Sequence, residues 1–153
     1  MSNLTFQVEN WYACVAEMAK LWPIHWEEVA NNKDKIPLDV HFEAYELMAQ
    51  TGELHIVTAR HKGVLVGYHW SIIRPHLHYY STLHAFTDIC FLLPEYRTGM
   101  NGVLLMKAFE DTTKVKGVKK LFTGSKVKFD KSPIFERLDW VRSEVVYTKW
   151  IGD

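Results

Sequence analysis

The sequence predicts an α+β fold in which a mixed, mostly antiparallel sheet is flanked by helices. Helical periodicity of apolar residues dominates the first fifty positions, whereas strand-like segments rich in β-branched and aromatic residues fill positions 54–93. Beyond them, helix-like and strand-like segments alternate, separated by glycine or proline. The chain has 153 residues, which suits a single domain over residues 1–153 whose core needs neither a disulfide nor a structural metal.

The first third of the chain indicates one strand and two helical regions. Apolar residues at positions 4–8 predict a strand, and Asn10 is a plausible cap for a helix over 11–22. Pro23 interrupts that helix and opens a further turn. A second helix is expected to end at Gly52. Its apolar face carries Phe42, Tyr45 and Met48.

The middle of the chain predicts three strands in a meander. Positions 54–59 and 64–73 flank a turn at Gly63 and indicate a hairpin. A break is expected at Pro75, because proline lacks the N–H group that a strand ladder uses. A third, longer strand is predicted over positions 79–93.

The last third predicts a helix, a strand, a helix and a strand in that order. The first helix is expected over positions 102–116, with Gly117 as its C-terminal cap. A strand follows at 118–123 and a short helix at 132–138. The final strand is predicted at 145–150, which completes the α+β order.

Composition and charge exclude several classes of protein. Lys and Arg together number 18, as do Asp and Glu, so the chain lacks a basic footprint and no nucleic-acid partner is expected. No apolar run is long enough to span a membrane, and the first ten residues lack a signal-peptide core. Cys14 and Cys90 form neither a disulfide framework nor a metal pattern. We therefore expect a cytoplasmic protein without a membrane partner.

The stretch from Cys90 to Leu105 carries the most chemical information. A strand ends at a proline, a loop holds an arginine and glycines, and an amphipathic helix follows at once. Several backbone N–H groups and a helix N-terminus therefore converge in one small space. Such a site suits a phosphate or diphosphate, and Arg97 can add a charge-assisted contact.

This stretch resembles the acyl-CoA-binding motif of the GNAT N-acetyltransferases, which reads Val-x-Pro-x-x-(Arg/Gln)-x-x-Gly-x-(Gly/Ala). Met100 stands where the first motif glycine belongs, and Gly99 lies one place earlier. Residues 134–140 look like the family's C-terminal Phe-Tyr-Glu-Lys-Leu-Gly-Phe element. The order of elements is similar to the GNAT fold along nearly the whole chain, and small bacterial and phage members are the most similar. Four places of the motif are filled, by Leu92, Pro94, Arg97 and Gly102.

The resemblance implies an enzyme that transfers an acetyl group from acetyl-CoA to a primary amine, carried by a small molecule or a protein. The amine would attack directly, through a tetrahedral intermediate. A bulge in the strand before the motif would free N–H groups that polarise the thioester carbonyl. A homodimer is a further expectation from the family. The residues expected to contact the cosubstrate are Leu92, Leu93, Arg97, Thr98, Gly99, Met100, Asn101 and Gly102.

The reaction requires an unprotonated amine, so we expect a base near the long strand. A lysine-like amine has a pKa of about 10.4 and is almost fully protonated at pH 7. Strict alternation would place one set of side chains on a single face of the strand: His84, Phe86, Asp88, Cys90 and Leu92. Asp88 is the first candidate base, with a structural carboxylate as the alternative. His84 is the second, with an ordinary strand residue as the alternative.

The residue that protonates the departing thiolate is not evident in this chain. The family often uses a tyrosine in its C-terminal helix, where this sequence has Phe135. Tyr147 is the remaining candidate, and water is the alternative, because CoA thiolate is a tolerable leaving group near neutral pH. Met100 and Phe135 favour a second hypothesis, a catalytically weak or inactive GNAT-fold binding or structural protein related to those of phages.

Two further groups of side chains have open interpretations. His76 and His78 would share a face as a metal pair does, but a metal needs a third ligand, so none is expected. Three lysines follow the predicted fifth strand and either contact the 3′-phosphate of CoA or form a solvated basic face. They are Lys126, Lys128 and Lys131.

Overall fold

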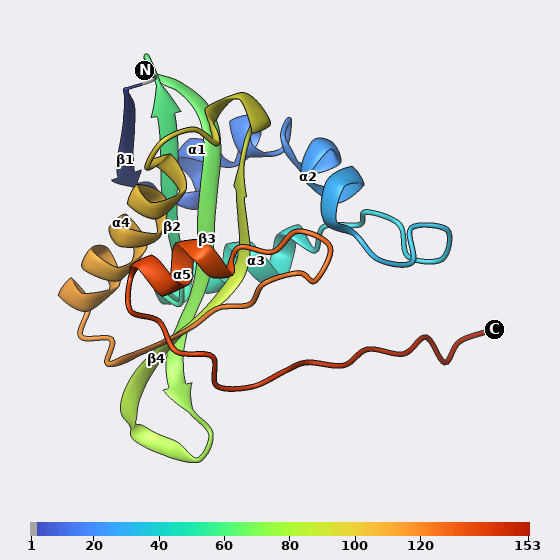
Figure 1. Cartoon of the computed structure of the whole chain (residues 1–153). Coiled ribbons are helices and arrows are strands. Elements are labelled where there is room, and N and C mark those ends of the chain that lie inside the picture. Colours follow the sequence, from blue (N-terminus) through green and yellow to red (C-terminus); the bar gives the residue numbers. More distant parts are fainter. Residues whose placement is uncertain (1–2) are drawn as a thin grey trace.

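The computed structural model describes residues 3–153, in which helices cover both faces of a five-stranded sheet (Figure 1). The N-terminal elements are β1 (Leu4–Val8), α1 (Trp11–Met18), α2 (Trp22–Val29) and α3 (Phe42–Thr51). The long strands β2 (Leu54–His61), β3 (Val64–His76) and β4 (Tyr79–Leu92) come next. The remaining elements are a short 3-10 helix η1 (Pro94–Tyr96), α4 (Asn101–Val115), β5 (Lys120–Phe122) and α5 (Ser132–Arg137).

The sheet is mixed and mostly antiparallel, as predicted. Its strands lie in the order β1-β2-β3-β4-β5, and the first four pair antiparallel with their neighbours. β5 runs parallel to β4 and pairs with it only from His84 to Phe86. Beyond Phe86, the edge of β4 that faces away from β3 has no strand partner among residues 3–153. The sheet therefore has an open edge in the second half of β4.

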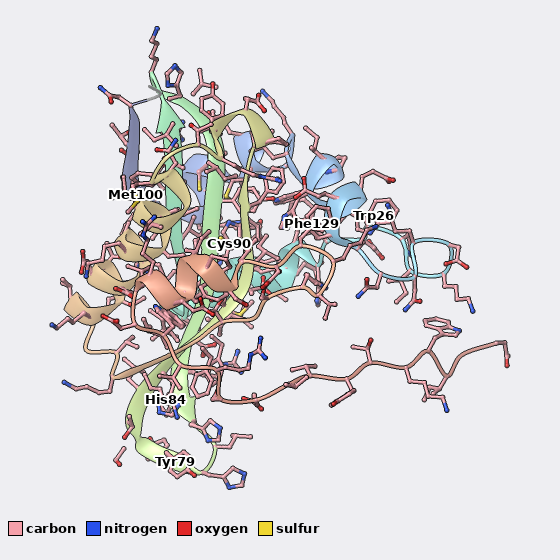
Figure 2. All side chains as sticks on the ribbon, in the orientation of Figure 1. Trp26, Tyr79, His84, Cys90, Met100 and Phe129 are labelled. Carbon is pink, nitrogen blue, oxygen red and sulfur yellow. The ribbon has the colours of Figure 1, made fainter. Side chains whose placement is uncertain are left out.

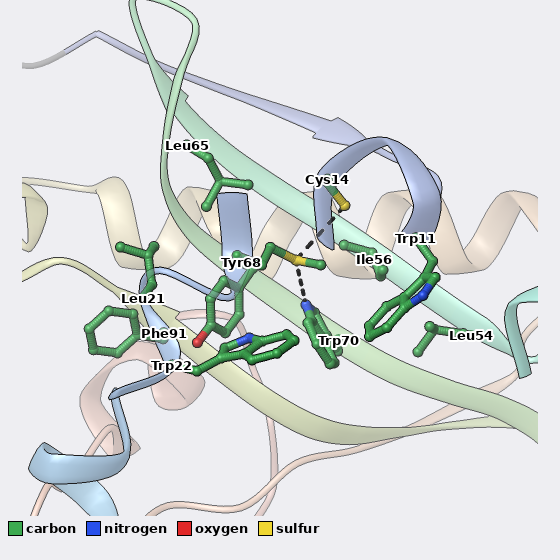
Figure 3. Packing of buried hydrophobic residues seen from close by; sticks show 11 residues of the cluster. Trp11, Cys14, Leu21, Trp22, Leu54, Ile56, Leu65, Tyr68, Trp70 and Phe91 are labelled. Atoms are coloured by element: carbon green, nitrogen blue, oxygen red, sulfur yellow. Dashed lines mark hydrogen bonds between the residues drawn. The ribbon is translucent and has the colours of Figure 1, made fainter. Parts of the chain in front are cut away.

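Each face of the sheet has its own apolar core. On one face, α1, α2 and α3 cover a cluster that includes Trp11, Trp22 and Trp70 (Figure 3). Within this cluster the indole N–H of Trp70 donates to the sulfur of Met18 at 3.0 Å. On the other face, α4 and α5 pack against the strands around Phe109, which is fully buried. The open edge of β4 thus lies between two separately stabilised layers.

A β-bulge in β4 places one extra residue at Asp88. Trp70 of β3 pairs with Ile89, whereas the adjacent Ser71 pairs with Thr87. The alternation of side chains therefore restarts one residue out of step after the bulge. Ile89 packs against the Trp70 cluster, and Cys90 packs under α4. The bulge expected from the family resemblance is confirmed.

The bulge overturns the common face predicted for the long strand. Before it, Ala85 packs under α4 and α5, so His84 points to the opposite face. After it, Cys90 and Leu92 are the residues that pack under α4. Asp88 lies on the α3 side, where it contacts Tyr45. The prediction that all five side chains share one face is therefore wrong.

Two other predictions about the strands are wrong. The break expected at Pro75 is absent, because β3 continues to His76 with Pro75 paired to Leu83. β2 no longer flanks β3 beyond Ile72, so the missing N–H of Pro75 leaves no ladder bond unmade on that side. The final strand expected at 145–150 does not form, and residues 141–153 are exposed and extend away from the sheet (Figure 1).

Candidate functional site

A groove with a volume of about 1310 Å³ passes the open edge of β4 and is lined from both sides of the sheet. We call its two halves the aromatic arm and the amide arm. The aromatic arm lies toward α2 and α3 and includes Trp22, Trp26, His41, Tyr45, Trp70 and Asp88. The amide arm lies toward α4 and α5 and includes Cys90, Leu92, Gly99, Gly102, Val103 and Lys131.

The open edge of β4 presents backbone N–H groups to the amide arm. The N–H of Leu93 donates to the carbonyl oxygen of Val66 at 2.9 Å, which fixes the alternation along this half of β4. The N–H and C=O groups of Leu92 and Cys90 therefore point away from β3. Arg97 Nε donates to the Leu92 oxygen at 2.7 Å, and a lysine covers the Cys90 oxygen. With both carbonyls bound, the edge offers hydrogen-bond donors.

The lysine on this edge is Lys131, whose role the sequence left open. Its Nζ donates to the Cys90 carbonyl oxygen at 3.0 Å. Lys126 also lines the groove, whereas Lys128 does not. The amide arm therefore holds ammonium groups beside the exposed edge of the strand.

The start of α4 adds further donors to the same arm. Gly99 has a φ of +56°, a conformation that favours glycine, and Met100 has an ordinary φ of −100°. The loop therefore needs its glycine at position 99, one place before the family's motif glycine. Within residues 3–153, the N–H groups of Gly99, Met100, Gly102 and Val103 have no backbone acceptor. Four donors are thus left at a helix N-terminus.

The side chain of Met100 does not close this site. Its sulfur accepts a contact from Arg137 Nη1 at 3.4 Å, and the side chain is outside the groove lining. Gly102 has a second reason to lack a side chain, because a Cβ there would lie 2.9 Å from the terminal methyl of Ile134. The glycine at 102 therefore permits the close packing of α4 on α5 as well as access to the amides.

Arg97 is held by a carboxylate that sequence reasoning missed. Its Nη2 donates to both carboxylate oxygens of Glu28 in α2, at 2.7 and 2.8 Å. Together with the bond to Leu92, these contacts tie the loop before α4 to the opposite side of the groove. Arg97 and Glu28 are 69 positions apart in the chain, so no local pattern could reveal the pair.

The aromatic arm brings Asp88 and Tyr45 together. The Tyr45 hydroxyl donates to Asp88 Oδ2 at 2.6 Å. Burial, followed by the hydrogen bond and the negative charge of Asp88, raises the pKa of Tyr45 well above its usual value. The tyrosine therefore stays a donor and fixes one oxygen of the carboxylate. Trp70 packs edge-on against the Tyr45 ring and forms part of the floor of the arm.

His25 is another groove residue that sequence reasoning missed. Its ring stacks on Phe91 and its Nδ1 lies 3.0 Å from the Tyr68 hydroxyl. Burial, followed by the positive charges of Lys131 and Arg97, lowers the pKa of His25 to about 4. The imidazole is therefore neutral at pH 7. Its spacing from Trp22 and Trp26 on α2 was the only sequence signal for this position.

Several predicted site residues lie elsewhere. His84 packs among His76, Tyr79 and Phe122 near the β3–β4 hairpin, and Figure 2 shows it far along the strand from Cys90. Tyr147 is 90% exposed and does not line the groove.

The described residues contain neither a cluster of metal-binding side chains nor a membrane-spanning helix. The rings of His76 and His78 lie 5.6 Å apart, but no group of three or more metal-binding side chains occurs in residues 3–153. None of the helices in this range is long and apolar enough to cross a membrane.

Comparison with known proteins identifies the fold. No family model matches the chain, and no curated protein does. A ribosomal-protein-alanine N-acetyltransferase from Brucella melitensis biovar Abortus 2308 has a TM-score of 0.76 and 16% identity over 99% of both chains. An aminoglycoside acetyltransferase from an uncultured soil metagenomic sample, in complex with trehalose, has a TM-score of 0.74 and 13% identity over 98% of this chain and 97% of the other. The chain has the GNAT fold.

A third structure with the GNAT fold contains a ligand that joins CoA to an amine. It is the aminoglycoside N-acetyltransferase AAC(6')-Iy in complex with the bisubstrate analogue CoA-S-monomethyl-acetylneamine. Its TM-score is 0.72 and its identity 18%, over 99% of this chain and 100% of the other. The predicted fold class is therefore confirmed, and the chemistry has to be argued from the residues of this chain.

Proposed function

We propose that this protein is an acetyl-CoA-dependent N-acetyltransferase that acetylates a primary amine. The observation that carries the proposal is the continuity of the groove, which joins a donor-only strand edge and a helix N-terminus to a carboxylate on the other arm. Fold similarity to acetyltransferases adds support. A homodimer and a cytoplasmic location stay predictions.

The amide arm fits the chemistry of acetyl-CoA. The free N–H groups of Gly99, Met100, Gly102 and Val103 match a diphosphate, which needs several donors and a positive helix end. The edge N–H groups of Cys90 and Leu92 match carbonyl acceptors on an extended ligand, because an open strand edge pairs with amides. When bound, acetyl-CoA would supply the activated thioester.

Asp88 is the proposed base on the aromatic arm. The bulge turns its carboxylate toward α3, and Tyr45 holds one of its oxygens. The other oxygen has no protein donor among residues 3–153, so it is available to accept a proton from the amine, directly or through water. The amine would add to the thioester carbonyl as it gives up its proton, and the tetrahedral intermediate would then collapse with cleavage of the C–S bond and departure of the thiolate.

The departing thiolate would find a cation at the same strand edge. Phe135 lines the groove but has no hydroxyl to donate. The ammonium of Lys131, held at the Cys90 carbonyl oxygen, can neutralise the thiolate that leaves beside it. We therefore propose Lys131 for this role in place of Tyr147, which lies outside the groove lining.

A thermal-shift titration combined with one variant tests the proposal. A ligand at 100 times its Kd stabilises a protein by about 2.7 kcal/mol, so millimolar acetyl-CoA should raise the Tm measurably. The Asp88→Asn variant should keep this shift while the rate of CoA thiol release falls by about 10²- to 10⁴-fold. Tyr45→Phe is the matched control and should lose less, because it leaves the carboxylate in place.

Two results would contradict the proposal. No shift at millimolar acetyl-CoA would favour a GNAT-fold binding or structural protein without a CoA site. Equal losses of turnover and of CoA affinity in Asp88→Asn would make Asp88 a structural carboxylate.

A further inference from the structure

Building on the proposed function, we infer that the acceptor is a monoamine with a flat apolar or aromatic body, not a polycation such as an aminoglycoside or a polyamine. The acceptor amine is expected in the aromatic arm, because that side of β4 carries Asp88, the proposed base. Its walls and its charges both favour this class of amine.

Most of the side chains that line the aromatic arm are apolar or aromatic. Trp22 and Trp70 are 7% and 1% exposed and form a rigid floor, since their rings pack edge-on at 5.7 Å. Trp26 of α2 also lines the groove, and Figure 2 shows it on the side of the molecule near Phe129. Aliphatic side chains complete the lining: Val29, Leu38, Val40, Met48 and Ile72. Such a surface gains free energy by covering an apolar body.

The charges of the aromatic arm match a single ammonium. Asp88 is the carboxylate where the arm meets the edge of β4, and its position beside Tyr45 suits one amine. Glu28 is already bound in bidentate fashion by Arg97. Asp39 lines the groove from the exposed segment before α3. A second ammonium would therefore find only an exposed carboxylate in this arm, and such an ion pair contributes little to binding.

The aromatic floor also suits a protonated amine before it reacts. The Tyr45 ring, which packs edge-on with the buried Trp70, lies next to Asp88, and aromatic rings attract a cation while they cover an apolar chain. The amino group would therefore lie at Asp88 and the body of the ligand would extend over the apolar wall toward α2. This orientation places the nitrogen at the strand edge where the two arms meet.

A matched panel of amines tests the inference on the full chain. Phenethylamine and tryptamine represent the proposed class, spermidine and neamine represent polycations, and ethylamine lacks the apolar body. With acetyl-CoA, kcat/KM for tryptamine or phenethylamine should exceed that for spermidine and neamine by about tenfold or more, because even one methylene in a hydrophobic pocket is worth roughly 10- to 200-fold. Thermal shifts with each amine in the presence of CoA should follow the same order.

Two variants test whether the preference for aromatic amines comes from the groove. Trp26→Ala should raise KM for tryptamine about tenfold and KM for ethylamine by less, because it removes apolar wall that only the larger amine covers. Trp150→Ala is the matched control and should change neither value, since Trp150 lies outside the groove lining.

The outcomes separate this inference from the proposed function. Acetylation of spermidine or neamine with higher kcat/KM than tryptamine would overturn the inference while confirming the acetyltransferase. If no amine is acetylated, the thermal shifts decide, and equal or absent shifts for both classes overturn the inference. If the proposed function itself is wrong, acetyl-CoA alone does not raise the Tm.

Discussion

The two arms of the groove are built from different parts of the chain. The amide arm presents backbone N–H groups from β4 and from the start of α4. The aromatic arm presents side chains, chiefly Trp22, Tyr45, Trp70 and Asp88. A site made of backbone groups is kept wherever the fold is kept, even when the sequence changes. This is consistent with the structural matches at 13–18% identity and with the absence of a matching family model. Side chains can change while the fold persists, so under the proposed function the aromatic arm would select the acceptor.

The largest expected effect tests whether the aromatic arm is part of the core. Trp70→Ala should lower the free energy of unfolding by about 3–5 kcal/mol, because it removes a fully buried indole and its contact with Met18. Urea unfolding measures this loss. A decrease in unfolding free energy below about 1 kcal/mol would mean that the floor of the aromatic arm is independent of the core. The view of this arm as a site built on core side chains would then be wrong.

Acidification should weaken both layers of the sheet. Burial is the main reason that the pKa of His25 is lowered to about 4, that of His55 to about 4 and that of His69 to about 3. Below pH 6.5 the unfolded histidines bind protons that the folded ones do not, so stability falls as the pH drops from about 6.5 toward 4. Each contributes about 1.4 kcal/mol per pH unit in this window.

Urea unfolding between pH 7.5 and 4.5 measures this slope. The His25→Gln variant should reduce this slope by the share of one histidine. A stability that is flat across the window would show that these imidazoles become protonated within the fold.

The smallest expected effect tests whether Arg97 binds CoA as well as joining the loop before α4 to α2. Arg97→Ala should raise the Kd for CoA about tenfold, or 1.4 kcal/mol, with little change in unfolding free energy, because the pair with Glu28 is partly exposed. Glu28→Gln should leave CoA binding equal or tighter, since it removes a negative charge from the groove. Isothermal titration with CoA gives both values. An unchanged Kd in Arg97→Ala would assign Arg97 only to joining the loop to α2.

Local sequence patterns predicted most of the fold. Caps, turn glycines and periodicity located the helices and the long strands within a few residues, and the glycine-rich loop indicated the free amides at Gly99 and Gly102. The strand at 145–150 failed because β-branched residues favour a strand only where a partner edge is present. The continuation of β3 through Pro75 depended on where β2 ends, which is a property of the sheet and not of the segment.

The candidate site was predicted only in part. Asp88 was proposed from a strand alternation that the bulge overturns, although it does line the groove, and its partner Tyr45 was missed because 43 positions separate them. Glu28, His25 and Lys131 reach the groove from other elements through tertiary packing alone. Sequence patterns reveal residues that are close along the chain, whereas this site is formed by residues that are far apart in the sequence and meet only in the folded protein.

The extra residue at Asp88 also sets the phase of the part of β4 that follows it. If Asp88 were paired as an ordinary strand residue, the earlier alternation would continue, so Ile89 and Phe91 would turn toward α4 while Cys90 and Leu92 turned toward the tryptophans. Because the bulge takes Asp88 out of the pairing, its carboxylate is set at the groove and each layer of the sheet keeps the side chains that it encloses.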